Sequence, residues 1–163
     1  MIRMAARAGA LLLLPLSLVA CQQGSANTTA QLTPAQIAAN AADTLVVYKT
    51  PTCGCCNDWV DHVKAHGFTV VAHDLNDLSQ IKQQLGVPAG RISCHTATVR
   101  GYTVEGHVPA DLIAKMLAEK PRFRGLTVPG MPMGSPGMEG PWKDDYEVLS
   151  FDDAGNVAVY AKR

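Results

Sequence analysis

Hydrophobic residues recur at the two-residue spacing of strands in some segments of this chain and at the wider spacing of helices in others. Short apolar and β-branched runs bounded by polar or turn residues are typical of strands. Four runs are therefore predicted to be strands: TLVVYKT (44–50), FTVVAHDL (68–75), ISCHTATV (92–99) and YTVEGHV (102–108). Only an Arg-Gly pair separates the last two, so we expect them to form a hairpin.

Three other stretches have apolar residues at helical spacing. The first helix is expected over residues 55–66 and ends at Gly67, the second begins after Asp77, and the third opens at Pro109. A further short helix is expected in TPAQIAANAA, residues 33–42. The three apolar faces are predicted to consist of Trp59, Val60 and Val63; of Leu78, Ile81 and Leu85; and of Leu112, Ile113, Met116 and Leu117.

The predicted element order is β-α-β-α-β-β-α, which resembles the order of the thioredoxin and glutaredoxin folds. A stretch rich in Gly, Pro and Met follows, and then YEVLSF and VAVYAK, which are expected to pair around a turn at DDAGN. The predicted fold class is therefore α/β: a thioredoxin/glutaredoxin-like domain over 44–120. A Met-rich loop and C-terminal hairpin over 121–163 are expected to pack on the same domain.

The N-terminus has the pattern of an export signal. Arg3 and Arg7 precede the apolar run AGALLLLPLSLVA, so residues 1–20 are predicted to be a signal peptide. LVAC resembles a bacterial lipobox, in which the cysteine, here Cys21, is lipidated; an ordinary signal with a chance cysteine is the alternative. Residues 21–43 would then be the lipidated cysteine and a tether. Gln22, rather than Asp, after the cysteine favours the outer membrane over the inner one.

Composition and charge restrict the function further. The chain has 163 residues, no formal net charge at pH 7 and 47% hydrophobic residues, which suits one globular domain with a modest core. Because no basic run or patch is present, nucleic acid is not an expected partner. The predicted location is the periplasmic side of a bacterial membrane, an oxidising compartment.

The cysteines carry the candidate chemistry. Cys53, Cys55 and Cys56 lie in TPTCGCC, between the first predicted strand and the first helix, and Cys94 lies in a later strand. Two disulfides are disfavoured because Cys55 and Cys56 are adjacent and cannot pair without strain. A helix N-terminus lowers the pKa of a thiol, and thiolates are needed for both disulfide exchange and metal binding.

Cys94 is predicted to meet the other cysteines. In glutaredoxins, a loop with a cis proline precedes the third strand and lies against the C-x-x-C motif. VRGYTVEG resembles the stretch that follows that loop, and counting back from it places Cys94 and His95 on the loop's Val-Pro pair. Cys94 should then face Cys53 and Cys56, with His95 where the cis proline would be. A small buried hydrophobe is the other interpretation of Cys94.

Soft ligands near this site would favour a soft metal. Four thiolates suit Cu(I), Zn(II) or an iron–sulfur cluster, and closely grouped thiolates can bridge several Cu(I) ions. Met131, Met133 and Met138 lie in GMPMGSPGMEG without helical spacing, and thioethers suit Cu(I) rather than zinc. Incidental methionines of a mobile loop, or methionines that fill gaps against the domain, are the alternative.

The histidines give a weaker signal. His95 is the best candidate ligand because Cys94 is its neighbour. His62 and His66 share one helix face, which is more simply interpreted as a solvated face. His107, just before a helix start, is expected to cap or orient the turn, with metal ligation as the less favoured alternative.

The motifs together resemble one family. YKTPTCGCC, GHVPADLI and GLTVPGMPMGSPGME are similar to the CopG-type periplasmic copper-resistance proteins, over roughly residues 44–161. The resemblance implies a thioredoxin-like fold, Cu(I) held by the cysteine cluster and a part in copper tolerance, with redox activity at the copper site less settled. The implied ligands are Cys53, Cys55, Cys56 and Cys94, holding one copper ion or more. Other periplasmic copper-handling proteins are the expected partners.

Two functions of different classes remain open at this stage. The first is a binding protein that sequesters or relays Cu(I). The second is an enzyme, a thioredoxin-like thiol–disulfide oxidoreductase that uses Cys53 and Cys56. The missing cis proline counts against the enzyme, because that loop normally docks the substrate peptide. A structural zinc domain is a minor third interpretation. In the binding protein, we expect Cys53–Cys56 to close as a disulfide when no metal is bound.

Overall fold

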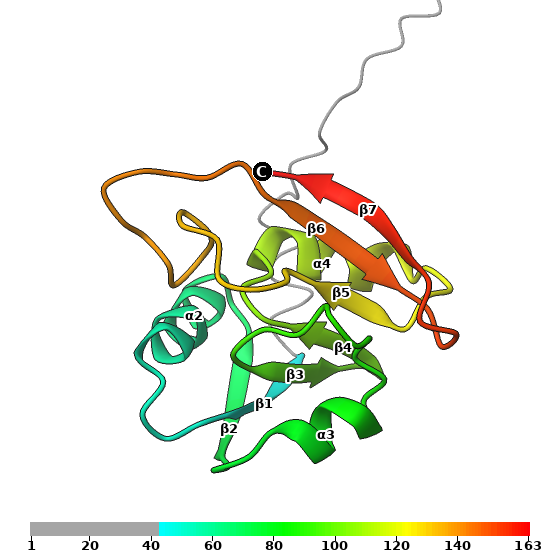
Figure 1. Cartoon of the computed structure of the whole chain (residues 1–163), viewed down its shortest axis with the longest axis horizontal. Helices are drawn as coiled ribbons and strands as arrows, with labels where there is room; N and C mark the ends of the chain where they lie inside the picture. Colours follow the sequence, from blue (N-terminus) through cyan, green and yellow to red (C-terminus); the bar gives the residue numbers. More distant parts are fainter. Residues whose placement is uncertain (1–42) are drawn as a thin grey trace, which may run out of the picture. The chain divides into compact units, whose positions relative to one another are not determined.

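A computed structural model of the chain describes residues 43–163, and these form a mixed α/β fold around one seven-stranded sheet (Figure 1). The predicted signal peptide, the lipidation site at Cys21, the tether and the short helix over 33–42 lie outside the described residues. Among residues 43–163, no helix is long and apolar enough to cross a membrane.

The strands lie in the order β2-β1-β3-β4-β5-β6-β7 across the sheet. Parallel neighbours are β1 with β2 and β4 with β5, and the other neighbours are antiparallel. The first four strands and the helices form the predicted thioredoxin-like unit. Figure 1 shows β6 and β7 at the opposite edge of the sheet from β1 and β2. The strands are β1 (Thr44–Lys49), β2 (Thr69–Asp74), β3 (Thr96–Val99), β4 (Tyr102–Glu105), β5 (Gly125–Thr127), β6 (Glu147–Phe151) and β7 (Val157–Lys162), and the helices are α2 (Gly54–Ala65), α3 (Ser79–Gln84) and α4 (Ala110–Glu119).

One strand was missed and two strand boundaries were wrong; the run 102–108 is a strand only as far as Glu105. Gly125–Thr127 was expected to be loop, but it forms β5 between β4 and β6, so the C-terminal hairpin continues the main sheet. The hydrophobic run 92–99 becomes a strand only at Thr96, which leaves Cys94 and His95 in the preceding loop. A segment of three residues such as β5 becomes a strand because it pairs with neighbouring strands. Its own three residues contain no pattern that predicts this pairing.

The hairpin of β3 and β4 sets the register of the site. Its two-residue turn, Arg100 and Gly101, has positive φ at both positions (48° and 83°), which is the backbone of a type I′ turn. The turn places Thr96 opposite Glu105 and Ala97 opposite Val104. Because side chains alternate between the faces of a sheet, Ala97 and Val104 point to one face and Thr96 and Glu105 to the other.

The first of these faces holds the main core. Trp59 and Val63 of α2 and Ile113 of α4 have no exposed surface, and they pack in the same buried cluster as Ala97 and Val104. The Trp59 indole Nε1 donates to the Val108 carbonyl over 2.9 Å, which satisfies the one polar group of this large side chain and fixes α2 against the segment before α4. The prediction that Met116 belongs to the core is confirmed, since it is fully buried.

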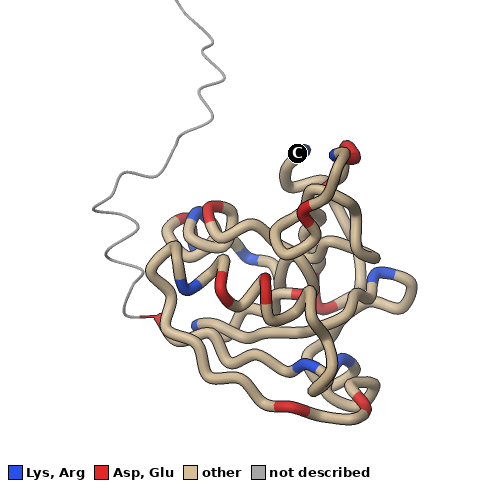
Figure 2. The backbone as a smooth tube through the Cα atoms, turned by 90° about the vertical axis from the view of Figure 1, so that its left-hand side faces the viewer, with Lys and Arg blue, Asp and Glu red and all other residues tan. Residues whose placement is uncertain are grey.

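Acidic and basic residues are mixed along most of the described chain. Lys and Arg positions and Asp and Glu positions are interspersed along the backbone (Figure 2). The arrangement agrees with the balanced formal charge of the full sequence.

Candidate metal centre

The first three cysteines lie where β1 leads into α2. Cys53 occupies the N-cap position, and its amide donates to the Thr50 carbonyl over 3.2 Å. Cys56 lies in the first turn of α2 and is fully buried. Their Sγ atoms are joined in a disulfide, with the Cα atoms 5.3 Å apart. The predicted Cys53–Cys56 pairing is present, and Cys55 and Cys94 are free.

Cys94 reaches this group from the loop before β3. Its Sγ lies 3.9 Å from Cys55 Sγ, and Cys55 Sγ lies 3.6 Å from Cys53 Sγ. The four cysteine sulfurs all lie within 4.8 Å of one another. The placement predicted from the glutaredoxin register is correct.

The pKa of the Cys94 thiol lies above its ordinary value. Burial first, and then the nearby Cys55, raise this pKa to about 12. Desolvation disfavours a thiolate that has no cation beside it. A bound metal cation reverses that effect, because metal binding to thiols releases their protons.

His107 is a candidate ligand that the sequence analysis ranked below His95. It is fully buried, and its Nε2 lies 2.9 Å from Cys94 Sγ. Its Nδ1 donates to the Pro136 carbonyl over 2.8 Å, because a carbonyl can only accept, so Nε2 carries the lone pair that faces the cysteines. Burial lowers the pKa of His107, which favours this neutral, ligand-competent ring. A signal was available: the hairpin register, extended two residues beyond Thr96 and Glu105, places Cys94 opposite His107.

His95 lies on the buried side of Cys94 and has no exposed surface. Its Nδ1 lies 3.3 Å from Cys94 Sγ, its ring centroid is 4.3 Å from that of Trp59, and its Nε2 has no hydrogen-bond partner. Burial, followed by the charges of His107 and Lys82, lowers its pKa well below the ordinary value. It occupies the position where the register predicted a histidine in place of a cis proline, and residues 43–163 contain no cis peptide bond.

The three methionines of the loop are placed differently. Met131 Sδ lies 3.9 Å from Cys55 Sγ, with the side chain half-exposed at the rim of the cluster. Met133 Sδ lies directly beside Gly140 within the loop, and the backbone of Met138 closes a turn with Gly134. The structure therefore brings Met131 to the cysteines, whereas Met133 is engaged inside its own loop.

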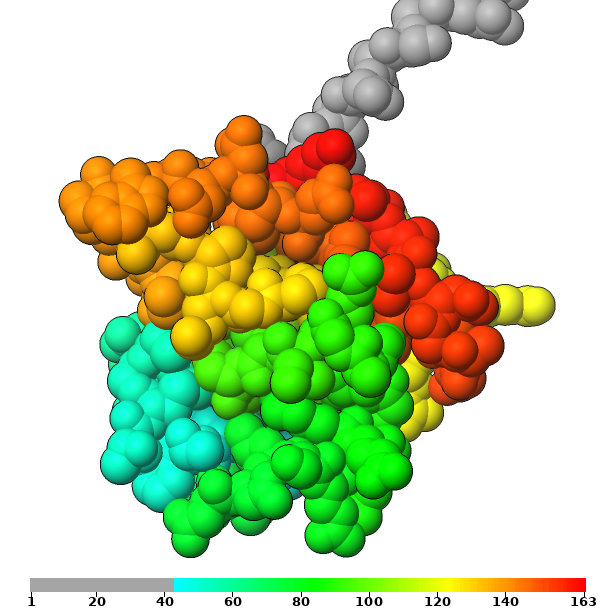
Figure 3. All heavy atoms as spheres, viewed as in Figure 1, coloured from blue at the N-terminus to red at the C-terminus, as the bar shows by residue number. Residues whose placement is uncertain are grey.

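The Met-rich loop folds onto the start of α2, and Figure 3 shows its yellow and orange atoms against the cyan atoms of that helix. Gly137 marks the contact. A Cβ at this position would lie 2.6 Å from the Cys55 carbonyl oxygen and 2.7 Å from the Trp59 amide nitrogen. The close approach of the two backbones needs a residue without a side chain.

We expect Gly137→Ala to destabilise the protein by about 2–5 kcal/mol, from about 1–2 for left-handed backbone and about 1–3 for overpacking. The matched control is Gly155→Ala, because Gly155 has nearly the same φ (81° against 83°) but open space around it. Urea unfolding measures both variants. Equal losses of unfolding free energy in the two variants would show that the loop does not pack closely against α2.

The prediction of a solvated His62–His66 face is wrong for His62. Its Nε2 accepts from the Ala110 amide over 3.2 Å, so the ring caps the first turn of α4. Burial first, and then the neighbouring His66, lower its pKa to about 4. His66 is exposed, as expected.

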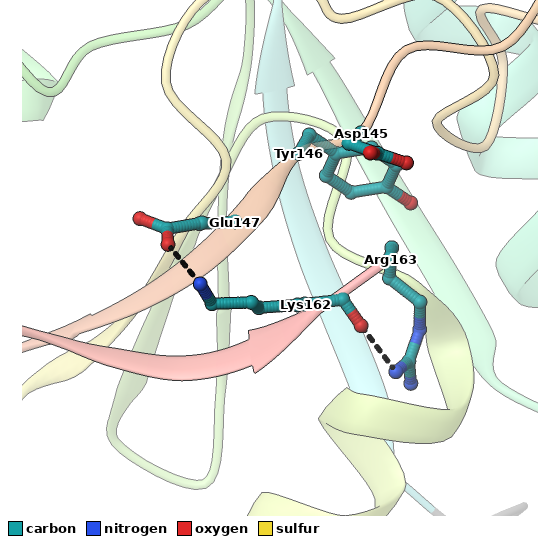
Figure 4. Close-up of a pocket in the computed structure, with 5 residues that line it drawn as sticks. All are labelled: Asp145, Tyr146, Glu147, Lys162 and Arg163. Atoms are coloured by element: carbon teal, nitrogen blue, oxygen red, sulfur yellow. Dashed lines mark hydrogen bonds and ion pairs between the residues drawn. The ribbon is translucent and has the colours of Figure 1, made fainter.

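A pocket elsewhere in the domain lacks comparable chemistry. It is lined by residues 145–147 and by Lys162 and Arg163 (Figure 4). Lys162 pairs with Glu147 at 3.3 Å, and the Arg163 guanidinium donates to the Lys162 carbonyl and to Asp111. The pocket therefore offers paired charges and no sulfur ligand.

Fold and site together define a thioredoxin-like α/β protein with a cysteine group that can hold a metal. The family model described as a protein of unknown function, DUF411, matches residues 91–138. Two solved structures, titled copper resistance protein copG, forms 1 and 2, are each 45% identical to this chain, with a TM-score of 0.70. The matches cover 74% of this chain and 96% or 98% of theirs. No curated protein sequence matches. The chain belongs to the family of CopG-type copper-resistance proteins.

Proposed function

We propose that this protein binds Cu(I), one ion or more, on the thiolates of Cys53, Cys55, Cys56 and Cys94 and thereby contributes to copper tolerance. The observation that carries the proposal is the grouping of all four sulfurs within 4.8 Å of one another. Thiolates at this separation can share a soft cation or bridge several, and such ligands select Cu(I) over harder metals. The copper-resistance titles of the two similar structures support copper as the cargo.

Neutral donors complete the proposed site. His107 presents a lone pair toward Cys94, Met131 lies beside Cys55, and His95 lies on the buried side of Cys94. Imidazole and thioether donors add no charge, so they can complete the coordination of Cu(I) without further anionic repulsion. Met133 and Met138 remain candidates only if the loop rearranges, because Met133 Sδ is held beside Gly140.

Copper load and thiol state are coupled in this proposal. The closed Cys53–Cys56 disulfide removes two of the four thiolates from the donor set. Bound Cu(I) would protect the same two thiols from oxidation, and the thiolates would keep the ion from free redox cycling. Electron transfer at the copper site is an extension of this proposal.

The proposed location is the periplasmic side of the outer membrane, with Cys21 as the lipid anchor and other periplasmic copper-handling proteins as partners. The N-terminal pattern of basic residues, apolar run and LVAC supports it. Metabolic labelling with a radioactive fatty acid tests the anchor. Label that persists in a Cys21→Ser variant would refute it.

A thiol–disulfide oxidoreductase is the second candidate. The Cys53–Cys56 disulfide at the N-terminus of α2 favours it, because that position activates the first cysteine of a C-x-x-C pair. The buried His95 at the place of the cis proline opposes it. Insulin reduction that needs only Cys53 and Cys56 would support this candidate over copper binding.

An anaerobic Cu(I) titration of the reduced protein against a chromophoric chelator tests the main proposal. Uptake that withstands competition by the chelator, with a stoichiometry above one, is the expected result. Uptake no stronger than that of free thiols such as glutathione would reject copper binding.

A further inference from the structure

A buried carboxylate lies on the opposite face of the sheet from the main core, close to the metal centre. Glu105, the last residue of β4, has no exposed surface, and its side chain receives three hydrogen bonds. Lys82 Nζ donates to Oε1 over 2.6 Å, the Ser93 amide donates to the same oxygen over 2.6 Å, and the Thr96 hydroxyl donates to Oε2 over 2.6 Å. Lys82 also donates to Thr96 Oγ1 over 2.9 Å, so these groups form one connected network.

The network holds the backbone on both sides of Cys94. The Ser93 amide immediately before Cys94 bonds to Glu105, and Thr96 lies two residues after it. The backbone of the Glu105 segment adds two contacts: Gly106 N donates to the His95 carbonyl over 2.9 Å, and Val128 N donates to the Glu105 carbonyl over 3.0 Å. The Cys94 loop is therefore fixed at the end of β4.

The same network reaches the Met-rich loop through Ser93. The Ser93 hydroxyl donates to the Gly130 carbonyl, and Gly130 N donates to the Ile92 carbonyl over 3.2 Å. Gly130 is followed by Met131, whose sulfur lies 3.9 Å from Cys55 Sγ. The Glu105 carboxylate thus holds the segment that carries Cys94. That segment in turn contacts the segment that carries Met131.

Burial of this ion pair is not explained by stability. Removing two charges from water is costly, and apolar residues of similar volume often stabilise a fold equally well or better. Precise geometry is what a network of directed, charge-assisted hydrogen bonds supplies and an apolar contact does not.

We propose that Glu105, together with Lys82, is a positioning residue of the metal centre that sets the place of the Cys94 and Met131 loops relative to the cysteines of α2. The proposal rests on the proposed copper function for its purpose, although its geometry is independent of any metal. Loss of the network should loosen the Cys94 loop while α2 and its Cys55 stay in place.

The test compares two cysteines within one molecule. The reduced, metal-free full chain is treated with iodoacetamide, and mass spectrometry of peptides gives the alkylation rate of Cys94 relative to Cys55. The variants are Glu105→Gln, which keeps the shape of the side chain, and the double variant Lys82→Met with Glu105→Leu, which replaces the ion pair by apolar groups. Asp111→Asn is the matched control, because it removes an exposed ion pair of the same 2.6 Å length.

The expected result is a Cys94 to Cys55 rate ratio about tenfold higher in both network variants, as for a local opening made about 1.4 kcal/mol easier. The ratio should not change in Asp111→Asn. Cu(I) affinity should fall about 10–100-fold, the usual effect of losing an outer-shell partner.

Folded network variants with an unchanged ratio would overturn the proposal, and so would variants that both fail to fold, since the network would then act through stability alone. The alkylation ratio needs no copper. If wild-type protein binds no Cu(I) while the ratio still rises, the copper function fails and the positioning role stands.

Discussion

Cys94→Ala is expected to lower the number of Cu(I) ions bound by the reduced protein and to weaken the remaining binding by at least about 100-fold, the upper end of what loss of an outer-shell partner costs. Cys94 is the one cluster sulfur that does not come from the α2 segment. It also lies at the meeting point of Cys55, His107 and His95, at 3.9, 2.9 and 3.3 Å. Its removal therefore separates the thiolates from the imidazoles.

An anaerobic titration of both proteins against the same chelator measures this effect. His66→Ala is the control, because it removes a potential metal ligand that is exposed at the C-cap of α2 and is not part of either metal-competent group of side chains. Equal uptake by wild type and Cys94→Ala would show that the α2 cysteines bind copper without the second loop.

Reduction of the Cys53–Cys56 disulfide is expected to raise copper uptake from one Cu(I) at most to more than one. In the disulfide form, the sulfurs and nitrogens left to bind copper are those of Cys55, Cys94, Met131, His107 and His95. The neighbouring sulfurs of this set are 3.9 Å apart, close to the separation that Cu–S bonds of about 2.3 Å, the length found at zinc thiolates, give at a tetrahedral metal. Such a set fits a single ion.

The two forms are titrated without oxygen, one after reduction and removal of the reductant and one with the disulfide intact, and alkylation confirms the thiol count in each. A Cys53→Ser/Cys56→Ser variant is the control, since it lacks the same two donors and cannot form the bond. Its uptake should match that of the disulfide form and should not respond to the reductant. A wild type whose uptake is the same in both forms would break the link between copper load and thiol state.

Much of the fold could be predicted because it depends on local repeats. The helical spacing of Trp59 and Val63 and the β-branched strands give the element order directly, since each side chain's direction follows from its position in a regular element. The two-residue turn at Arg100 and Gly101 then sets the register in which β3 pairs with β4. β5 could not be predicted, because the state of Gly125–Thr127 depends on the strands beside it.

The candidate site divides in a similar way. The placement of Cys94 against the α2 cysteines follows from motif spacing and a resemblance to glutaredoxins, and the structure agrees with it. His107 was ranked below His95, yet its Nε2 lies closer to Cys94 Sγ. The hairpin register could have identified this pair, but the tautomer depends on the Pro136 carbonyl of a loop distant in sequence.

The grouping of the four thiols follows from residue types and regular elements, which place them at the N-terminus of one helix and at the start of one hairpin. The neutral donors that join them depend on tertiary packing. Met131 rather than Met133 reaches the cysteines because Gly137 allows the loop to contact α2, and a buried Glu105 holds the Cys94 loop from the other face of the sheet. A loop has no regular periodicity from which the direction of a side chain can be predicted. That direction is set by packing against residues distant in sequence.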